Sequence, residues 1–234
     1  GAERLADQYG ISRDEMDQWA LMSHQRAVAS RDKLREEMIS VDGLLPDGTP
    51  TRVDHDQNPR GDTTLEKIRS LMPVYRADGK ITAATSSGQA DGAAICVVMS
   101  AEKARARALK PLARIHTLAT GACAPTDLIY SAIPATHRAV KLSGLSMADF
   151  GVIEVNEAFA CAPLAVMREF KLSDEDRDRI NVNGGACAIG HPVGASGARV
   201  LVTLLHEMQK RDAKKGLATL CIGGGMGIAM CVER

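Results

Sequence analysis

The C-terminal half of the chain alternates apolar runs with amphipathic segments, and this alternation limits the folds open to the chain. An apolar run at residues 152–155 precedes a predicted helix at about 158–170. A second predicted helix, 196–209, carries one apolar stripe and precedes predicted strands at 217–222 and 228–232. Strands that alternate with helices are typical of an α/β domain, in which helices cover a sheet. We therefore expect an α/β fold.

Length and composition place the chain in a broad class. It has 234 residues, of which 45% are hydrophobic and 25% charged, as in globular proteins. Lys+Arg and Asp+Glu both number 29 and aromatic residues make up 3%, so neither net positive charge nor base-stacking side chains favour nucleic-acid binding. No apolar run approaches the roughly 20 residues of a membrane helix, so we expect no membrane partner.

The N-terminal third has a different organisation. Ser12 and Glu15 fit a capping box at the start of a helix. Residues at helical spacing behind this cap mark one face of the helix: Met16, Trp19, Ala20, Ser23 and Ala27. Residues 41–80 are polar and rich in turns, which predicts surface loops around short elements. A turn and helix at 89–94 and a buried strand at 95–99 are expected to follow.

Three segments of the C-terminal half place a polar residue where an apolar run ends or a tight turn begins. Asn156 follows the run at 152–155, His191 lies in a Gly-His-Pro turn, and Cys221 precedes three glycines. In open α/β sheets ligands gather at the carboxyl ends of strands, so these side chains are expected to converge. A His, a Cys and an Asn suffice for proton transfer and for hydrogen bonding to a developing oxyanion.

Simpler interpretations of the same residues stay open at this point. The ring of His191 can bond a backbone carbonyl, and Cys221 can serve as a small buried hydrophobic residue. The glycines around His191 do not have G-x-G-x-x-G spacing, and no Gly-Lys-Ser/Thr follows them, so a dinucleotide or phosphate loop is disfavoured. The six cysteines form no C-x-x-C pair and no regular ladder, which predicts buried thiols in a reducing compartment.

Several motifs of this chain resemble those of the thiolase family, the group of acetyl-CoA acetyltransferases and 3-ketoacyl-CoA thiolases, and they occur in the same order as in that family. They include Asn-Glu-Ala-Phe-Ala at 156–160, the segment 181–197 and Cys-Ile-Gly-Gly-Gly-Met-Gly at 221–227. The resemblance implies a thiolase fold, a mixed sheet in α-β-α layers with part of an inserted loop domain. It divides the chain into the remainder of the coenzyme A-binding loop domain (1–89), the last part of the N-terminal domain (90–112) and the C-terminal domain (113–234).

The resemblance also implies an activity and residue roles. The reaction is acyl transfer between coenzyme A thioesters: Claisen condensation of two acetyl-CoA to acetoacetyl-CoA, or the reverse thiolysis of a 3-ketoacyl-CoA, as in fatty acid metabolism. His191 matches the histidine that activates the nucleophilic cysteine and helps bind the thioester oxygen, and Cys221 matches the cysteine that moves the α-proton. Asn156 and the N–H of Gly223 match groups of two oxyanion holes. Coenzyme A thioesters are substrates, and neither a cofactor nor a metal is implied.

Coenzyme A contacts carry over by position only. Arg60 matches an arginine near the adenine and phosphates, Leu71 and Tyr75 lie along the pantetheine path, and Ala83 and Ser87 match small residues of its tunnel. Two departures from the family pattern put single contacts in doubt. Ala84-Thr85-Ser86 replaces a more usual Gly-Asn-Ala, and Lys67 stands where a serine is often found.

The family's nucleophilic cysteine, in a Cys-x-Ser-Gly-like turn, matches none of the six cysteines here. We therefore expect this chain to be a piece of a longer polypeptide or one of two subunits, completed by an N-terminal thiolase segment and inactive alone. A homodimer or homotetramer is expected from the family, and the cytoplasm is the default compartment. Two alternatives remain: a non-catalytic acyl-CoA-binding subunit of this fold, and a condensing enzyme of the ketoacyl synthase type, which Cys221 disfavours.

Overall fold

A four-stranded mixed sheet forms the centre of the computed structural model, which describes residues 1–234. Its order is β3-β6-β5-β4, in which β5 pairs antiparallel with β6 and parallel with β4. The strands are β3 (Arg114–Ala122), β4 (Val152–Val155), β5 (Lys215–Ile222) and β6 (Met226–Glu233). The strand predicted at 152–155 is confirmed, and the other two predicted strands are confirmed with slightly wider bounds.

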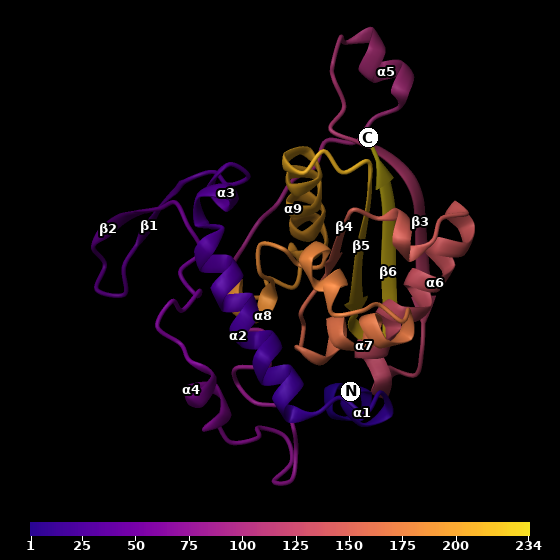
Figure 1. Cartoon of the computed structure of the whole chain (residues 1–234). Coiled ribbons are helices and arrows are strands. Elements are labelled where there is room, and N and C mark those ends of the chain that lie inside the picture. Colours follow the sequence, from indigo (N-terminus) through magenta and orange to yellow (C-terminus); the bar gives the residue numbers. More distant parts are fainter.

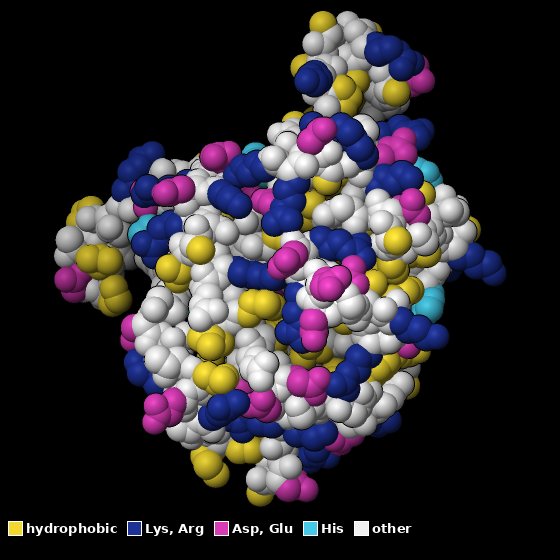
Figure 2. Space-filling model, viewed as in Figure 1, with side chains coloured by type: hydrophobic (Ala, Val, Ile, Leu, Met, Phe, Trp, Pro, Cys, Tyr) yellow, Lys and Arg dark blue, Asp and Glu magenta, His cyan; other side chains and the backbone are white.

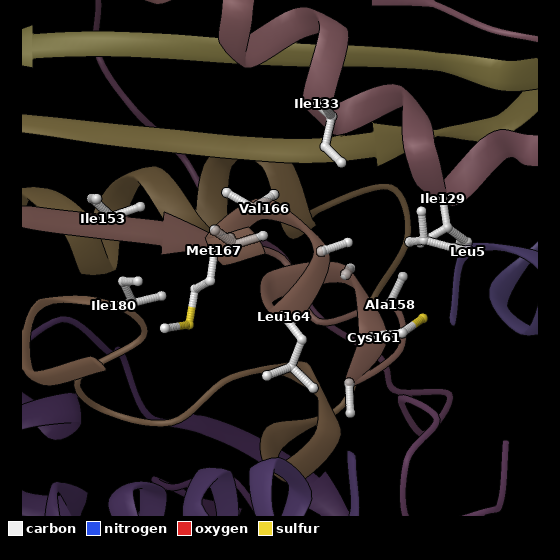
Figure 3. Close-up of a cluster of buried hydrophobic side chains, with 14 of the residues drawn as sticks. Leu5, Ile129, Ile133, Ile153, Ala158, Cys161, Leu164, Val166, Met167 and Ile180 are labelled. Atoms are coloured by element: carbon white, nitrogen blue, oxygen red, sulfur yellow. The ribbon is translucent and has the colours of Figure 1, made fainter. Parts of the chain in front are cut away.

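Helices cover both faces of this sheet, as an α/β fold requires (Figure 1). One face packs against α6 (Ala132–Ser143) and α7 (Cys161–Glu169), and the other against α9 (Ser196–Lys210). Strand alternation produces the two faces: Val152 belongs to the cluster under α9, whereas Ile153 belongs to the cluster on the opposite face. Figure 3 shows the larger cluster, in which Val166 and Met167 of α7 lie close to the strand that carries Ile153.

Close approach of α6 to the sheet explains two glycines in the strands. A Cβ on Gly121 would lie 2.9 Å from Ala135 Cα, and one on Gly227 would lie 2.9 Å from Ala132 N. Real Cβ atoms do not approach other heavy atoms so closely, so the two glycines allow the helix to lie directly on β3 and β6.

The N-terminal third folds over one side of this domain. Helix α2 (Arg13–Ala29) begins at the predicted capping box, with Ser12 and Glu15 bonding reciprocally, and its predicted face is buried throughout. Figure 1 shows α2 crossing in front of α8, with a hairpin projecting beside it. The other elements here are α1 (Ala2–Gln8), α3 (Arg31–Arg35), α4 (Leu65–Arg69), and the hairpin strands β1 (Val41–Leu44) and β2 (Pro50–Val53).

Two local predictions differ from the structure. Residues 90–99 form neither the expected helix nor a paired strand: Ile95, Val97 and Val98 are 85%, 80% and 69% exposed, because no strand of this chain lies beside them. The segment continues into α5 (Ala101–Ala106), which projects from the body (Figures 1 and 2). Helix α7 begins at Cys161 rather than near 158, because Ala158 O and Ala160 N bond to the segment around Thr85.

Short helices and 3-10 turns complete the chain: η1 (Pro125–Ser131), η2 (Met147–Asp149), η3 (Glu175–Arg179), α8 (Ala186–Ile189) and η4 (Gly223–Gly225). None of the helices combines the length and the apolar character that crossing a bilayer demands. The α/β fold with a mixed, helix-covered sheet is as expected.

Candidate active site

Two of the three predicted catalytic side chains lie at the same edge of the sheet because β4 and β5 are parallel. The register pairs Val155 with Thr219, and Asn156 N donates to Thr219 O at 3.0 Å. Asn156 therefore follows β4 directly and Cys221 lies near the carboxyl end of the neighbouring β5, where ligands gather in α/β sheets. Asn156 is buried and Cys221 half-buried.

His191 reaches this edge on a turn that follows α8. Gly190 has φ of 91°, a conformation that favours glycine, and this turns the chain toward the sheet. Two bonds hold the turn: His191 N donates to Gly88 O at 2.8 Å, and Arg199 Nη1 donates to Gly190 O at 2.6 Å. The backbone of this turn is therefore held from both the loop segment and α9.

The two side chains meet directly, with 3.3 Å between Asn156 Nδ2 and His191 Nε2. On the other side of the ring, His191 Nδ1 lies 2.5 Å from Ser196 Oγ, and that hydroxyl donates to Pro192 O at 3.1 Å. Because the hydroxyl proton is used by Pro192, we assign the ring proton to Nδ1 and the lone pair to Nε2. Burial, and then the charge of Arg199, lowers the pKa of His191, which favours this neutral ring.

Cys221 and Gly223 complete the edge. Burial raises the pKa of the Cys221 thiol from 9.0 to about 11, so the ligand-free site holds it as a thiol. Gly223 is exposed, and nothing lies within 4 Å of the position that a Cβ would take. Its backbone is therefore open to a substrate. The edge thus holds a proton acceptor at Nε2 of His191, a proton donor at Sγ and a bare glycine turn.

A larger cavity of about 430 Å³ lies beside this edge, between the loop segment and α8. Its lining includes the predicted coenzyme A residues Arg60, Leu71 and Ala83. It also includes Lys67 and Ala84, two of the positions at which this sequence differs from the family pattern. Its wall therefore combines two cationic side chains with small and apolar ones.

Two other predicted coenzyme A residues lie outside the lining of this cavity. Ser87 Oγ instead donates to Ala158 O at 3.0 Å, and Tyr75, 62% exposed, packs edge-on against Phe159 with 6.2 Å between ring centroids. Both thus contact the turn that follows Asn156. Their predicted roles at coenzyme A stay predictions.

Sequence reasoning missed two buried carboxyl groups behind the site, Glu154 and Glu157. Glu157 is 1% exposed and accepts hydrogen bonds from four groups: Trp19 Nε1, Ser23 Oγ, Asn181 Nδ2 and Cys187 N. It fastens α2 to the turns that carry Asn156 and His191. A charged residue inside the apolar run 152–155 was the available signal for Glu154.

No group of three or more His, Cys, Asp or Glu side chains is arranged to hold a metal ion. The charged residues that line the large cavity, Arg60, Lys67 and Asp62, offer instead two cations and one carboxylate. Guanidinium and ammonium groups suit phosphate oxygens of an elongated ligand.

Comparison with known proteins finds matches to one family, the thiolases, in both parts of the chain. Residues 1–102 match the model of the thiolase N-terminal domain and residues 109–234 that of the thiolase C-terminal domain. The acetyl-CoA acetyltransferase of Pseudomonas aeruginosa is 48% identical over 235 residues, which cover 100% of this chain and 59% of that protein. The 3-ketoacyl-CoA thiolase of Erwinia tasmaniensis is 45% identical over 236 residues, covering 100% and 61%.

Solved structures agree in fold. The Bacillus anthracis acetyl-CoA acetyltransferase superposes with a TM-score of 0.94 at 38% identity, and human mitochondrial 3-ketoacyl-CoA thiolase with 0.89 at 37%. Each match covers 99% of this chain and 58% of the other. The chain thus spans about 59% of the length of curated relatives such as the Pseudomonas protein. On this evidence the chain has the thiolase fold and belongs to the thiolase family.

Proposed function

We propose that this chain provides the proton-transfer and oxyanion-binding part of an acyl-CoA C-acyltransferase. The observation that carries the proposal is the contact between Asn156 Nδ2 and His191 Nε2, 3.3 Å, at the strand edge that also bears Cys221. Asn156 and His191 come from different turns, and Cys221 lies near the carboxyl end of the neighbouring strand. The contact of the first two beside the third supports a shared chemical task rather than three separate packing roles.

Cys221 is the group that moves the α-proton in this proposal. As a thiol it can give its proton to the α-carbon of an enolate formed when a 3-ketoacyl-CoA is cleaved, which leaves a thiolate. In the condensation direction the thiolate takes a proton from the methyl group of acetyl-CoA, and an enolate forms. The raised pKa of about 11 favours the thiol at neutral pH, so the first role needs no prior deprotonation.

Fixed donors stabilise the negative oxygen that both directions create. Asn156 Nδ2 and the open backbone of Gly223 supply hydrogen-bond donors at the edge, and preorganised donors are worth several kcal/mol at such a site, about 2.7–4 for one donor. His191 in its neutral form accepts a proton at Nε2 from an attacking thiol. Its lowered pKa supports this role, because an already protonated ring could not accept one.

The large cavity beside the edge is proposed to hold coenzyme A. Its volume of about 430 Å³ falls in the range of small-molecule sites, and its lining joins Arg60 and Lys67 to small residues such as Ala83. Cations suit the phosphates of coenzyme A, and small side chains leave room for the pantetheine arm. In this proposal the ligand is the thioester substrate, and the names of the relatives support acetyl or longer 3-ketoacyl groups.

The acyl-enzyme nucleophile is proposed to come from a companion N-terminal thiolase segment. None of the six cysteines is followed by x-Ser-Gly, and the extended segment that contains Ile95, Val97 and Val98 exposes apolar side chains suited to pairing with further strands. A homo-oligomer of the completed enzyme is part of the same proposal and is supported by family membership alone.

The test is deuterium exchange at the methyl group of acetyl-CoA, which requires only the residues of this chain. Residues 1–234 are incubated with acetyl-CoA in D₂O, and the deuterium content is followed by mass spectrometry. Incorporation that rises with pH and disappears in Cys221→Ser supports the proposal. Binding of coenzyme A without any exchange would overturn it in favour of a non-catalytic binding subunit, and acetoacetyl-CoA thiolysis by the chain alone would overturn the need for a companion.

A further inference from the structure

Two buried oxygen atoms behind the site have no protein donor. They are Asn156 Oδ1 and Glu154 Oε1, on residues that are 2% and 3% exposed. Leaving a buried acceptor without a donor is costly, so such atoms call for an explanation. Glu154 lies in β4 and Asn156 directly follows that strand, where Asn156 N still donates to Thr219 O of β5. Side chains two positions apart in such an extended segment lie on the same face.

Both residues line one small cavity. It lies under α9 and also touches Arg199, Thr203 and Leu34. The space open to the centre of a water molecule is about 10 Å³, which corresponds to one water. Such a water would have the two oxygens and the guanidinium of Arg199 around it, and buried waters typically make about three hydrogen bonds.

The Asn156 amide can turn in two ways, and only one serves the site. Its Nδ2 lies toward His191 Nε2, which holds a lone pair because the ring proton is on Nδ1. Its Oδ1 therefore points away from the site and needs a donor from behind. A water in the cavity can donate to Oδ1. The same-face neighbour Glu154 can hold that water, as a donor to its oxygen when the carboxyl group carries a proton and as an acceptor when it is ionised.

The surroundings of Glu154 favour the protonated form. Burial raises the pKa of Glu154 well above its usual range, and the charges of Glu37 and Glu157 raise it further, with Glu207 adding to them. The one cation in this group, Arg199, lowers it, but Arg199 gives its hydrogen bond to Gly190 O rather than to the Glu154 carboxyl.

We propose that neutral Glu154 donates a hydrogen bond to one water in this cavity, and that this water donates to Asn156 Oδ1 and so fixes the amide with Nδ2 toward His191. Glu154 is then a positioning residue: it touches neither substrate nor reacting atoms, and it sets which end of Asn156 faces the oxyanion. The inference concerns the same site as the proposed function and rests on that function for its catalytic meaning. Its test requires no turnover, so either can fail alone.

The experiment compares Glu154→Gln, which keeps a neutral donor of the same length, with Glu154→Leu, which keeps the volume and removes the donor. The readout is NMR of the full chain: the hydrogen-exchange rate of the Asn156 side-chain amide and its nuclear Overhauser contact with the His191 ring. We expect wild-type behaviour in E154Q. In E154L we expect exchange about tenfold faster and a weakened contact, because the buried Oδ1 loses its donor.

Val152→Ala is the matched control, because Val152 lies on the same face of β4, in the cluster under α9, and does not line the cavity. It weakens the same packing without removing a donor, so it should leave the Asn156 signals unchanged. Equal losses in E154Q and E154L, or equal losses in V152A, would overturn the proposal.

A second measurement does not depend on the folding of any variant. In wild type at pH 7 the infrared spectrum should contain the C=O band of a protonated carboxylic acid that is missing in E154Q, and a high-resolution crystal structure should place a water within hydrogen-bond distance of Asn156 Oδ1 and Glu154 Oε1. An ionised Glu154, or a dry cavity, would overturn the proposal.

Discussion

Replacement of Glu157 by glutamine should destabilise the whole chain, because the carboxylate is the common acceptor of two parts of the structure. Its Oε1 accepts from Trp19 Nε1 and Asn181 Nδ2, both at 2.9 Å, and its Oε2 accepts from Ser23 Oγ at 2.8 Å and Cys187 N at 3.1 Å. The glutamine amide has one oxygen and one NH₂ group. Two of the four donors that now bond the carboxylate would therefore face the NH₂ group, which is itself a donor.

The less costly orientation puts NH₂ at the Oε2 position. The Ser23 hydroxyl can then turn to accept from it and donate to Gly185 O, 3.4 Å away, but Cys187 N loses its acceptor. An unsatisfied buried donor costs about 1–3 kcal/mol. The two bonds at Oε1 also weaken when the charge is removed, so the free energy of unfolding should fall by about 2–4 kcal/mol in total. For a chain of this size that lowers Tm by about 4–16 °C.

Urea unfolding measures this change with two probes, far-UV circular dichroism and tryptophan fluorescence. Trp19 is the one tryptophan of the chain and bonds Glu157 directly, so its fluorescence reports the affected region. Coincident transitions would justify a two-state treatment. Glu175→Gln, at an exposed residue, is the control and should stay within about 0.5 kcal/mol of wild type. If the free energy of unfolding of Glu157→Gln also stays within about 0.5 kcal/mol of wild type, the Glu157 carboxylate is not the common acceptor described above.

Three further predictions concern single residues. Gly185→Ala should lower the free energy of unfolding by about 1–3 kcal/mol, because a Cβ there would lie 2.6 Å from both Glu157 oxygens. The control Gly194→Ala, where nothing lies within 4 Å of the added Cβ, should change little in thermal unfolding, and equal effects of the two variants would contradict the prediction. Burial lowers the pKa of His24, whose Nδ1 accepts a hydrogen bond from Arg60 N at 3.1 Å. The stability that neutral His24 contributes should therefore be present above about pH 6.5 and be lost as pH falls through the folded-state pKa. An NMR titration of His24 with a midpoint at or above about 6.5 would disprove this. Alkylation of Cys221 should be slow at neutral pH and accelerate up to about pH 11, as followed by mass spectrometry, and a plateau below pH 9 would be inconsistent with the buried thiol.

Several features could be predicted because they depend on local patterns. The capping box at Ser12 and Glu15, the buried face of α2 and the strand at 152–155 all follow from residue spacing, and the structure confirms them. The meeting of Asn156 and His191 also followed, through the rule that ligand-binding residues gather at strand ends. Strand β3, by contrast, was not predicted. Its residues pair with β6, more than 100 positions away, so nothing in its neighbourhood signalled the ladder.

Residue order alone is enough to predict the periodicities, the turns and the family motifs, because these depend on residues within a few positions of each other. Folding in three dimensions is needed to bring Glu157 to donors as far apart as Trp19 and Cys187, to place Glu154 behind Asn156, and to leave residues 95–99 unpaired. Such contacts depend on which distant surfaces meet on folding. A buried charge is tolerable only where those surfaces supply its partners, and one-dimensional spacing does not record where that is.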